Sequence, residues 1–134
     1  DCWQIREGDY FVSVNGTRGE AQKLAAEMQQ GREVVIEVRR PLVFRADIDK
    51  MDGALGMKVT YAPDSRSLVV EDVLDGLSIQ RWNEQNPQLP IVKLDRIIAV
   101  NGEMGSSAEL RANLEASENL RLTVSRPHDS CAAR

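Results

Sequence analysis

The chain contains an internal repeat, and this repeat limits what it can fold into more than any other feature. Residues 9–41 return as residues 95–127 without a gap, at a constant offset of 86 positions. Ten of these 33 positions carry the same residue in both copies, including an Asn-Gly pair. A repeat of this length indicates that one folding unit has been duplicated. Residues 42–94 precede the second copy and only residues 1–8 precede the first, so we expect the first unit to be incomplete.

Composition indicates a soluble globular protein, and the length indicates one domain, or one domain and part of another. The chain has 134 residues, of which 42% are hydrophobic and 28% are charged. The net charge of −4 lacks the excess of Lys and Arg that nucleic-acid binding needs, so we exclude that class. No apolar run approaches a membrane span, and no signal-peptide pattern opens the chain. We expect a fragment of a longer cytoplasmic polypeptide, because the first residue is Asp and the repeat is cut abruptly.

The two cysteines, Cys2 and Cys131, lie near opposite ends of the chain. Isolated cysteines in terminal segments favour free thiols in a reducing compartment, although a disulfide between them is the alternative. The sequence contains nothing that resembles a metal-ligand cluster, and we expect no cofactor.

The first copy of the repeat predicts a strand, a helix and a second strand. Residues 10–14 (YFVSV) are typical of a short strand, which Asn15 and Gly16 end because this pair favours turns with positive φ. Residues 19–30 predict a helix, since apolar side chains recur at helical spacing and a glycine follows. Residues 34–38 alternate apolar with charged side chains and predict the closing strand.

The second copy, with the segment before it, predicts a more complete set of elements. Strands are predicted at 43–48, 55–61, 67–73, 96–100 and 120–124, and helices at 77–82 and 107–116. Ser106 and Glu109 form a capping-box pattern that marks the start of the last helix. The fold class is α+β and mainly β: five to six antiparallel strands with two helices in a small, partly open barrel or sandwich.

Three segments follow from this pattern. Residues 42–127 form a unit large enough to bury its own core. Residues 1–41 supply strands without partners for them, so we expect that segment to be largely unfolded in isolation. Residues 128–134 are small and polar, and predict a disordered tail.

Residues 42–127 resemble a PDZ domain over their whole length. Residues 54–57 (ALGM) are similar to the carboxylate-binding Gly-Leu-Gly-Phe loop of that family. Residues 94–102 (LDRIIAVNG) are similar to its Gly-Asp-x-Ile-x-x-Val-Asn-Gly signature. Residues 1–41 resemble only the second half of another PDZ domain and lack a counterpart of the carboxylate loop. The resemblance implies a module that binds the C-terminal tails of partner proteins and performs no chemistry.

The resemblance also implies a site for the terminal carboxylate of the peptide. Backbone N–H groups around Leu55, Gly56 and Met57 would converge on this anion, and Gly56 would permit close approach because it has no side chain. Lys50 matches a position at which many family members keep a basic residue. The alternatives are that Gly56 only opens a strand and that Lys50 is a solvated loop residue.

A peptide groove would lie beside the strand that begins at Met57, with the helix from Ser107 as its other wall. The resemblance implies that the following residues line this groove: Leu55, Met57, Lys58, Val59, Ser107, Arg111 and Leu114. The apolar members would hold the last peptide side chain, or else be ordinary core residues. By family analogy the position near Ser107 selects the third-from-last peptide side chain, and a histidine there favours Ser or Thr. A serine leaves that preference open, whereas Arg111 could favour an acidic ligand.

Two other functions fit the sequence less well. PDZ-like modules also accompany serine proteases, but the chain contains no Gly-x-Ser-x-Gly signature, and its histidine, His128, has no triad partner nearby in sequence. The unpaired strand edges of the first copy could instead serve assembly with another chain. The sequence leaves the oligomeric state open.

Overall fold

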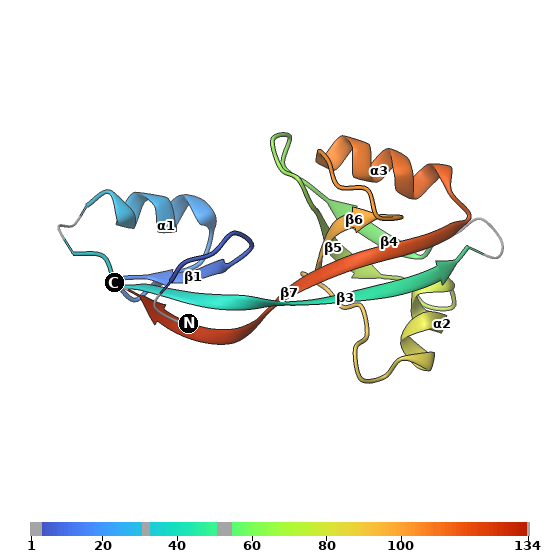
Figure 1. Ribbon diagram of the computed structural model, residues 1–134, viewed down its shortest axis with the longest axis horizontal. Coiled ribbons are helices and arrows are strands. Elements are labelled where there is room, and N and C mark those ends of the chain that lie inside the picture. Colours follow the sequence, from blue (N-terminus) through green and yellow to red (C-terminus); the bar gives the residue numbers. More distant parts are fainter. Residues whose placement is uncertain (1–3, 31–32, 51–54, 134) are drawn as a thin grey trace. The chain divides into compact units, whose positions relative to one another are not determined.

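The computed structural model describes residues 4–30, 33–50 and 55–133. Figure 1 shows its strands and helices in sequence order. The elements are β1 (Tyr10–Val14), β2 (Thr17–Arg18), α1 (Ala21–Met28), β3 (Ile36–Asp49), β4 (Met57–Thr60), β5 (Leu68–Val73), α2 (Ser78–Gln85), β6 (Arg96–Val100), α3 (Ser107–Ala116) and β7 (Asn119–Ala133). Cys2 lies outside the described residues, as does the side chain of Cys131, so the free-thiol expectation stays a prediction.

The strands follow the order β2-β1-β3-β7-β6-β5-β4. The pairings of β1 with β2 and β3, of β4 with β5, of β5 with β6 and of β6 with β7 are antiparallel. The predicted α+β class with a mainly antiparallel sheet is therefore confirmed. None of the described helices has the length and apolarity needed to cross a membrane.

The chain divides into two compact units. The first contains residues 1–42 together with residues 127–134, and the second contains residues 43–126. The long strands β3 and β7 contribute residues to both units, because residues 127–134 belong to the first. The structure contradicts the predicted disordered tail, because residues 128–133 continue strand β7. Strand β3 lies next to β7 in the sheet and supplies hydrogen-bond partners for its backbone N–H and C=O groups. The composition of the segment does not reveal this neighbour.

The second unit holds a continuous hydrophobic core beneath two helices. Figure 1 shows α2 and α3 on opposite sides of the strands of this unit. Side chains buried in this core come from α2, α3 and every strand of this unit except β4, and include Phe44, Leu68, Val70, Ile79, Ile97, Leu110, Leu114, Leu122 and Val124. The ring of Trp82 on α2 stacks on Phe44 with 6.4 Å between ring centroids, which anchors this helix.

Helix α3 begins and ends as its sequence predicts. The Ser106 hydroxyl accepts a hydrogen bond from the Glu109 backbone N–H at 3.2 Å. The Glu109 carboxylate in turn accepts from the Ser106 backbone N–H at 3.4 Å, which completes the capping box. Leu110 and Leu114 form the buried stripe of this helix. Because α3 borders the groove described below, this local signal positions one wall of the candidate site.

The strands of the first unit have partners within the seven-stranded sheet, contrary to the expectation that they lack them. Strand β1 pairs with β2 and with β3, and Leu24 on α1 is buried. The turn after β1 is held by Asn15, whose side-chain oxygen accepts from the Val35 backbone N–H at 2.7 Å. The equivalent Asn101 accepts from the Arg121 backbone N–H at the same distance. The repeated sequence is therefore matched by repeated hydrogen bonds.

Candidate functional site

A groove of about 540 Å³ lies between strand β4 and helix α3. Seven of the nine residues singled out in the sequence line it: Lys50, Leu55, Met57, Lys58, Val59, Arg111 and Leu114. Glu71 and Glu115 complete the lining. The sequence pattern missed both acidic residues, although the spacing of Glu115 four residues after Arg111 was a usable signal.

One wall of the groove is the edge of a sheet. Strand β4 ends the strand order, so among the described strands it has a neighbour, β5, on one side only. Met57 lies opposite Val73, and the next bond along the ladder runs from the Leu74 N–H to the Gly56 carbonyl at 2.8 Å. In an antiparallel ladder this arrangement makes Met57 and Val73 a non-hydrogen-bonded pair. The backbone N–H and C=O of Met57 therefore point away from β5, toward the open edge.

The turn before β4 orients the backbone N–H of Gly56 as well as that of Met57. The carbonyl of Leu55 accepts from the Ile79 N–H at 3.1 Å, and that of Gly56 accepts from Leu74. The described residues contain no cis peptide bond. Since N–H and C=O of a trans peptide point in opposite directions, the N–H groups of Gly56 and Met57 point away from Ile79 and Leu74. These two donors are consecutive, which is the backbone arrangement of an anion-binding nest.

Gly56 is required by the fold itself. Its φ is +82°, and a Cβ added there would lie 2.4 Å from the Cβ of Leu77. The sequence interpretation attributed this glycine to close approach of a ligand. The structure adds a reason that is independent of any ligand: the left-handed backbone and the contact with Leu77 both exclude a side chain.

The floor of the groove is apolar and continuous with the core. Leu114 is 5% exposed, and the half-buried side chains of Leu55, Met57 and Val59 pack against the core cluster. These residues therefore both pack against the core and line the groove, and their role in holding a peptide side chain stays a prediction. A ligand side chain placed here would extend the core and lose contact with water.

Lys50 connects the groove to the end of α3. Its Nζ donates to the Leu114 carbonyl, and its backbone N–H donates to the Glu118 carbonyl at 2.9 Å. Carbonyl groups in the last turn of a helix lack partners within the helix, so Lys50 satisfies one of them. Its ammonium group also brings positive charge to the groove. A role in binding a carboxylate stays a prediction.

Arg111 is held on the groove rim by two weak contacts. Its Nη1 donates to the Tyr61 hydroxyl at 3.4 Å, and its Nε donates to Glu115 at 3.3 Å. These contacts, that with Tyr61 first, raise the pKa of Arg111, so the guanidinium remains charged. Because the side chains of Arg111 and Glu115 are 54% and 70% exposed, their ion pair contributes little to stability. A ligand can therefore recruit Arg111 at small cost.

The structure places Ser107 differently from the sequence interpretation. Its side chain is 1% exposed and does not line the groove. The Ser107 hydroxyl donates toward the carbonyls of Ser65 at 2.8 Å and Ser67 at 3.0 Å, and also contacts the Ser65 hydroxyl. Ser107 thus fastens the start of α3 to the loop before β5. Its small polar side chain packs inside the unit and is not exposed on the wall of the groove.

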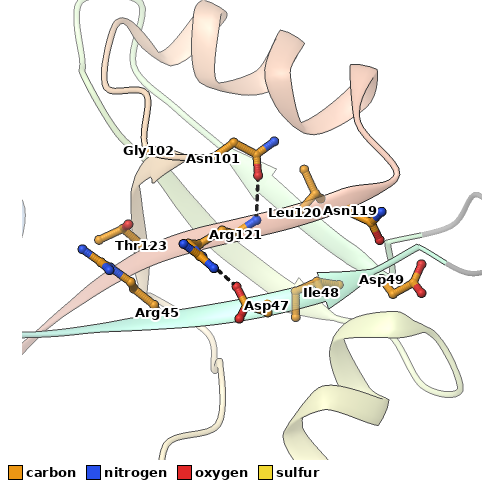
Figure 2. Close-up of a pocket in the computed structure, with 10 residues that line it drawn as sticks. All are labelled: Arg45, Asp47, Ile48, Asp49, Asn101, Gly102, Asn119, Leu120, Arg121 and Thr123. Carbon is orange, nitrogen blue, oxygen red and sulfur yellow. Dashed lines mark hydrogen bonds and ion pairs between the residues drawn. The ribbon is translucent and has the colours of Figure 1, made fainter.

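A second hollow of about 560 Å³ lies over β3 and β7 of the second unit (Figure 2). It is lined by Arg45, Asp47, Ile48, Asp49, Asn101, Gly102, Asn119, Leu120, Arg121 and Thr123. In Figure 2, Arg121 bonds Asp47 with 3.0 Å between Nε and Oδ1. This hollow contains none of the residues singled out in the sequence. The β4–α3 groove is therefore the better candidate site.

Among the residues that the structure describes, no group of His, Cys, Asp or Glu could hold a metal ion.

No protein-family model and no curated protein sequence matches the chain. Among solved structures, the chain is similar to INAD PDZ45 in complex with NG2 peptide, with 19% identity and a TM-score of 0.51, over 92% of this chain and 67% of that chain. It is also similar to INAD PDZ45 in complex with NORPA CC-PBM, with 20% identity and a TM-score of 0.49, over 92% and 68% of the two chains. At such identity, the first likeness concerns the fold alone. Taken with the antiparallel strand order described above, it shows that this chain has a PDZ-like fold.

Proposed function

We propose that this chain is a non-catalytic peptide-recognition module whose β4–α3 groove binds the C-terminal segment of a partner protein. The observation that carries the proposal is the outward-facing backbone of Met57 at an open strand edge, beside an apolar floor. A peptide adds to such an edge as a further strand, because its own backbone supplies the missing hydrogen bonds.

Each part of the groove has a role in this model. The last peptide side chain rests on Leu55, Val59 and Leu114, and the terminal carboxylate accepts from the N–H groups of Gly56 and Met57. Positive charge from Lys50 stabilises that carboxylate. The similar fold of INAD PDZ45, which was solved with NG2 peptide, supports a peptide as the ligand class.

The charges along the groove suggest which side chains the ligand carries. Lys58 and Arg111 favour acidic ligand side chains, whereas Glu71 and Glu115 favour basic ones. Arg111 can turn toward a ligand at small cost, since its hydrogen bonds to Tyr61 and Glu115 are long. We propose that an acidic residue upstream of the ligand terminus pairs with Arg111.

The expected affinity is micromolar, about −8 kcal/mol, because the interface is one short strand and one buried side chain. An affinity in this range suits a scaffold or adaptor that exchanges partners.

The experiment is a fluorescence-polarisation titration of the whole chain with a library of C-terminal peptides. Each peptide is prepared as a free acid and as a C-terminal amide. The enriched peptide is then methylated at one backbone nitrogen at a time, which removes single N–H groups without changing the protein. We expect amidation to weaken binding at least tenfold. We also expect methylation to weaken binding at alternate positions, because alternate N–H groups face β4. Equal affinities for acid and amide would exclude a carboxylate site, and uniform tolerance of methylation would exclude strand addition.

A variant of Lys50 tests its role separately. Lys50→Met removes the ammonium group but keeps much of the apolar stem. We expect it to reduce the ratio of acid to amide affinity, because only the charged terminus loses a partner. Damage to helix α3 would weaken both peptide forms alike and would leave the ratio unchanged. Lys93→Met is the matched control, since Lys93 is an exposed lysine that does not line the groove.

A further inference from the structure

A contact between Arg111 and Tyr61 joins the two walls of the β4–α3 groove at the end opposite Gly56. Arg111 lies on α3 and lines the groove, and Tyr61 directly follows β4, just beyond the lining residues. The Arg111 Nη1 donates to the Tyr61 hydroxyl at 3.4 Å, and the Arg111 Cζ lies 5.9 Å from the centre of the Tyr61 ring. The contact therefore marks the end of the groove that is farthest from the proposed carboxylate donors.

The Tyr61 hydroxyl keeps a hydrogen that it can donate. The bond from Arg111 uses a lone pair of the hydroxyl oxygen, and a phenol also carries one O–H donor. Among the residues that the structure describes, no acceptor receives this hydrogen. A bond accepted from a cation polarises the hydroxyl and strengthens it as a donor. The O–H of Tyr61 and the guanidinium of Arg111 thus place two kinds of donor together, which suits an anionic acceptor.

The nitrogens of Arg111 are not all occupied. Its Nε bonds Glu115 at 3.3 Å and its Nη1 bonds Tyr61, whereas Nη2 has no partner within the described part of the chain. An anion can therefore bind Nη2 and the Tyr61 O–H without displacing Glu115. The charge of Glu115 opposes a second anion, but its side chain is 70% exposed, so water and salt screen this repulsion.

The backbone of β4 determines which ligand residue comes near these donors. Val59 lies opposite Val70. The Val70 N–H donates to the Asp95 carbonyl at 2.8 Å, and the Val70 carbonyl accepts from the Leu94 N–H at 2.8 Å. Because both backbone groups of Val70 bond on its far side, Val59 and Val70 are a non-hydrogen-bonded pair. The N–H and C=O of Val59 consequently point to the open edge, as those of Met57 do.

A ligand strand on this edge presents every second side chain to the floor of the groove. Met57, Val59 and Tyr61 are partly buried against the core cluster, at alternate positions of one strand. The last and the third-from-last ligand side chains then share this face, about 7 Å apart. Arg111 precedes Leu114 by three residues, or roughly 4.5 Å along the helix axis. With the last side chain at Leu114, the third-from-last lies beside Arg111 and Tyr61.

We propose that Tyr61 determines specificity together with Arg111: its O–H and the guanidinium bind a carboxylate on the third-from-last side chain of the ligand. Ser107, which the family resemblance implied for this position, is buried and cannot reach a ligand. The inference rests on the proposed function and deepens it, because it names the ligand class. That class is the C-terminal tail with Asp or Glu as its third-from-last residue and an apolar last residue.

The test compares two free-acid peptides that differ only at the third-from-last position, where one carries Glu and the other carries Met, a neutral residue of similar length. Both are titrated by fluorescence polarisation into the whole chain and its variants. We expect the wild type to bind the Glu peptide at least tenfold more tightly. Tyr61→Phe, which keeps the ring and removes the O–H, should lower this ratio about threefold. Arg111→Met should bring the ratio close to one.

Two controls separate binding from packing. Tyr10→Phe removes the hydroxyl of the other tyrosine, which belongs to the first unit, and should leave the ratio unchanged. A peptide with Glu moved to the second-from-last position should be insensitive to Tyr61→Phe, because that side chain points to the other face of the strand.

The outcomes distinguish this inference from the proposed function. An unchanged ratio in Tyr61→Phe would overturn the inference, and so would an equal loss of affinity for both peptides, since that would assign Tyr61 to packing. In either case, tighter binding of free acids than of amides would leave the proposed function standing. Absence of binding by every peptide would overturn both.

Discussion

Asp95 and Arg126 form a covered ion pair, with 2.7 Å between Oδ2 and Nη2 and with side chains 3% and 22% exposed. The same pair occurs 86 positions earlier as Asp9 and Arg40, with 2.5 Å between Oδ2 and Nη1. Each carboxylate also accepts a hydrogen bond from the backbone N–H three residues before it. Each copy of the repeat therefore carries its own ion pair between the residue before its first strand and a residue within its long last strand, β3 or β7.

The two equivalent carboxylates differ in their surroundings, and we predict opposite pKa shifts. Burial raises the pKa of Asp95 above its ordinary 3.8, against the hydrogen bond from Val92 and the charge of Arg126. The hydrogen bond from the Arg6 N–H is the largest influence on Asp9 and lowers its pKa below 3.8, with Arg40 acting in the same direction. A ¹³C NMR titration of the carboxyl carbons should give midpoints on opposite sides of this value. Identical midpoints would contradict the prediction.

These shifts have opposite effects on stability. Asp9 contributes stability that is present above its unfolded pKa and lost as the pH falls through its lower folded pKa. Folded Asp95 holds its proton more tightly than the unfolded chain, so its contribution is present below pH 3.8 and lost as the pH rises through its folded pKa. The test is urea unfolding of wild type, Asp9→Asn and Asp95→Asn between pH 2 and 7, at intervals of about one pH unit. The slope of the unfolding free energy against pH should differ from wild type in opposite senses for the two variants.

Gly56→Ala should destabilise the chain more than Gly102→Ala. Both glycines have positive φ, +82° and +79°, so both substitutions incur about 1–2 kcal/mol of backbone strain. At Gly102 no atom lies within 4 Å of the added Cβ, whereas at Gly56 the Cβ meets Leu77 at 2.4 Å. We expect overpacking to add about 1–3 kcal/mol at Gly56. Equal losses in urea unfolding would show that Leu77 moves aside freely.

Ser107→His should destabilise the fold instead of creating a ligand-reading histidine. The Ser107 side chain is 1% exposed and bonds the Ser65 and Ser67 carbonyls, so an imidazole has no room. Ser107→Ala should cost about 1–2 kcal/mol, because it removes a buried hydroxyl and its hydrogen bonds. Ala108→His, at the exposed neighbouring position, is the control and should be nearly neutral. A stable Ser107→His variant that selects Ser or Thr in peptides would contradict this prediction and would place position 107 on the groove wall.

Asn101→Ala should cost about 1–3 kcal/mol of unfolding free energy. Asn101 has a φ of +53°, and its side chain accepts the Arg121 N–H at 2.7 Å, so alanine loses a hydrogen bond and strains the backbone. Asn101→Gly should cost less, because it loses only the bond. Asn113→Ala, which removes an exposed bond to Glu103, should change stability by less than about 0.5 kcal/mol. Equal effects of alanine and glycine at Asn101 would show that the backbone there is unstrained.

Local patterns account for the elements that the sequence predicted correctly. The bounds of α3 follow from the Ser106–Glu109 capping box, and those of β6 follow from the apolar run before Asn101. The lining of the groove was largely predictable for a similar reason. Met57, Lys58 and Val59 share one strand, and Arg111 and Leu114 share one helix.

The errors concern contacts between residues distant in sequence. Ser107 lies against Ser65 and Ser67, a contact across about forty positions that no local pattern signals. Residues 128–133 form a strand because β3 lies beside them, not because their composition favours one.

The sequence alone determined that a unit is duplicated, where β6 and α3 lie and which residues gather at β4 and α3. These properties depend on the spacing of residues along the chain, which sets backbone dihedrals and apolar faces locally. The tertiary structure alone decided which strand edges are paired, at which glycine a side chain would clash and which hydroxyl is buried. Those outcomes depend on the distance between atoms that the chain brings together only when it folds, because packing and hydrogen bonding act over a few ångströms in space.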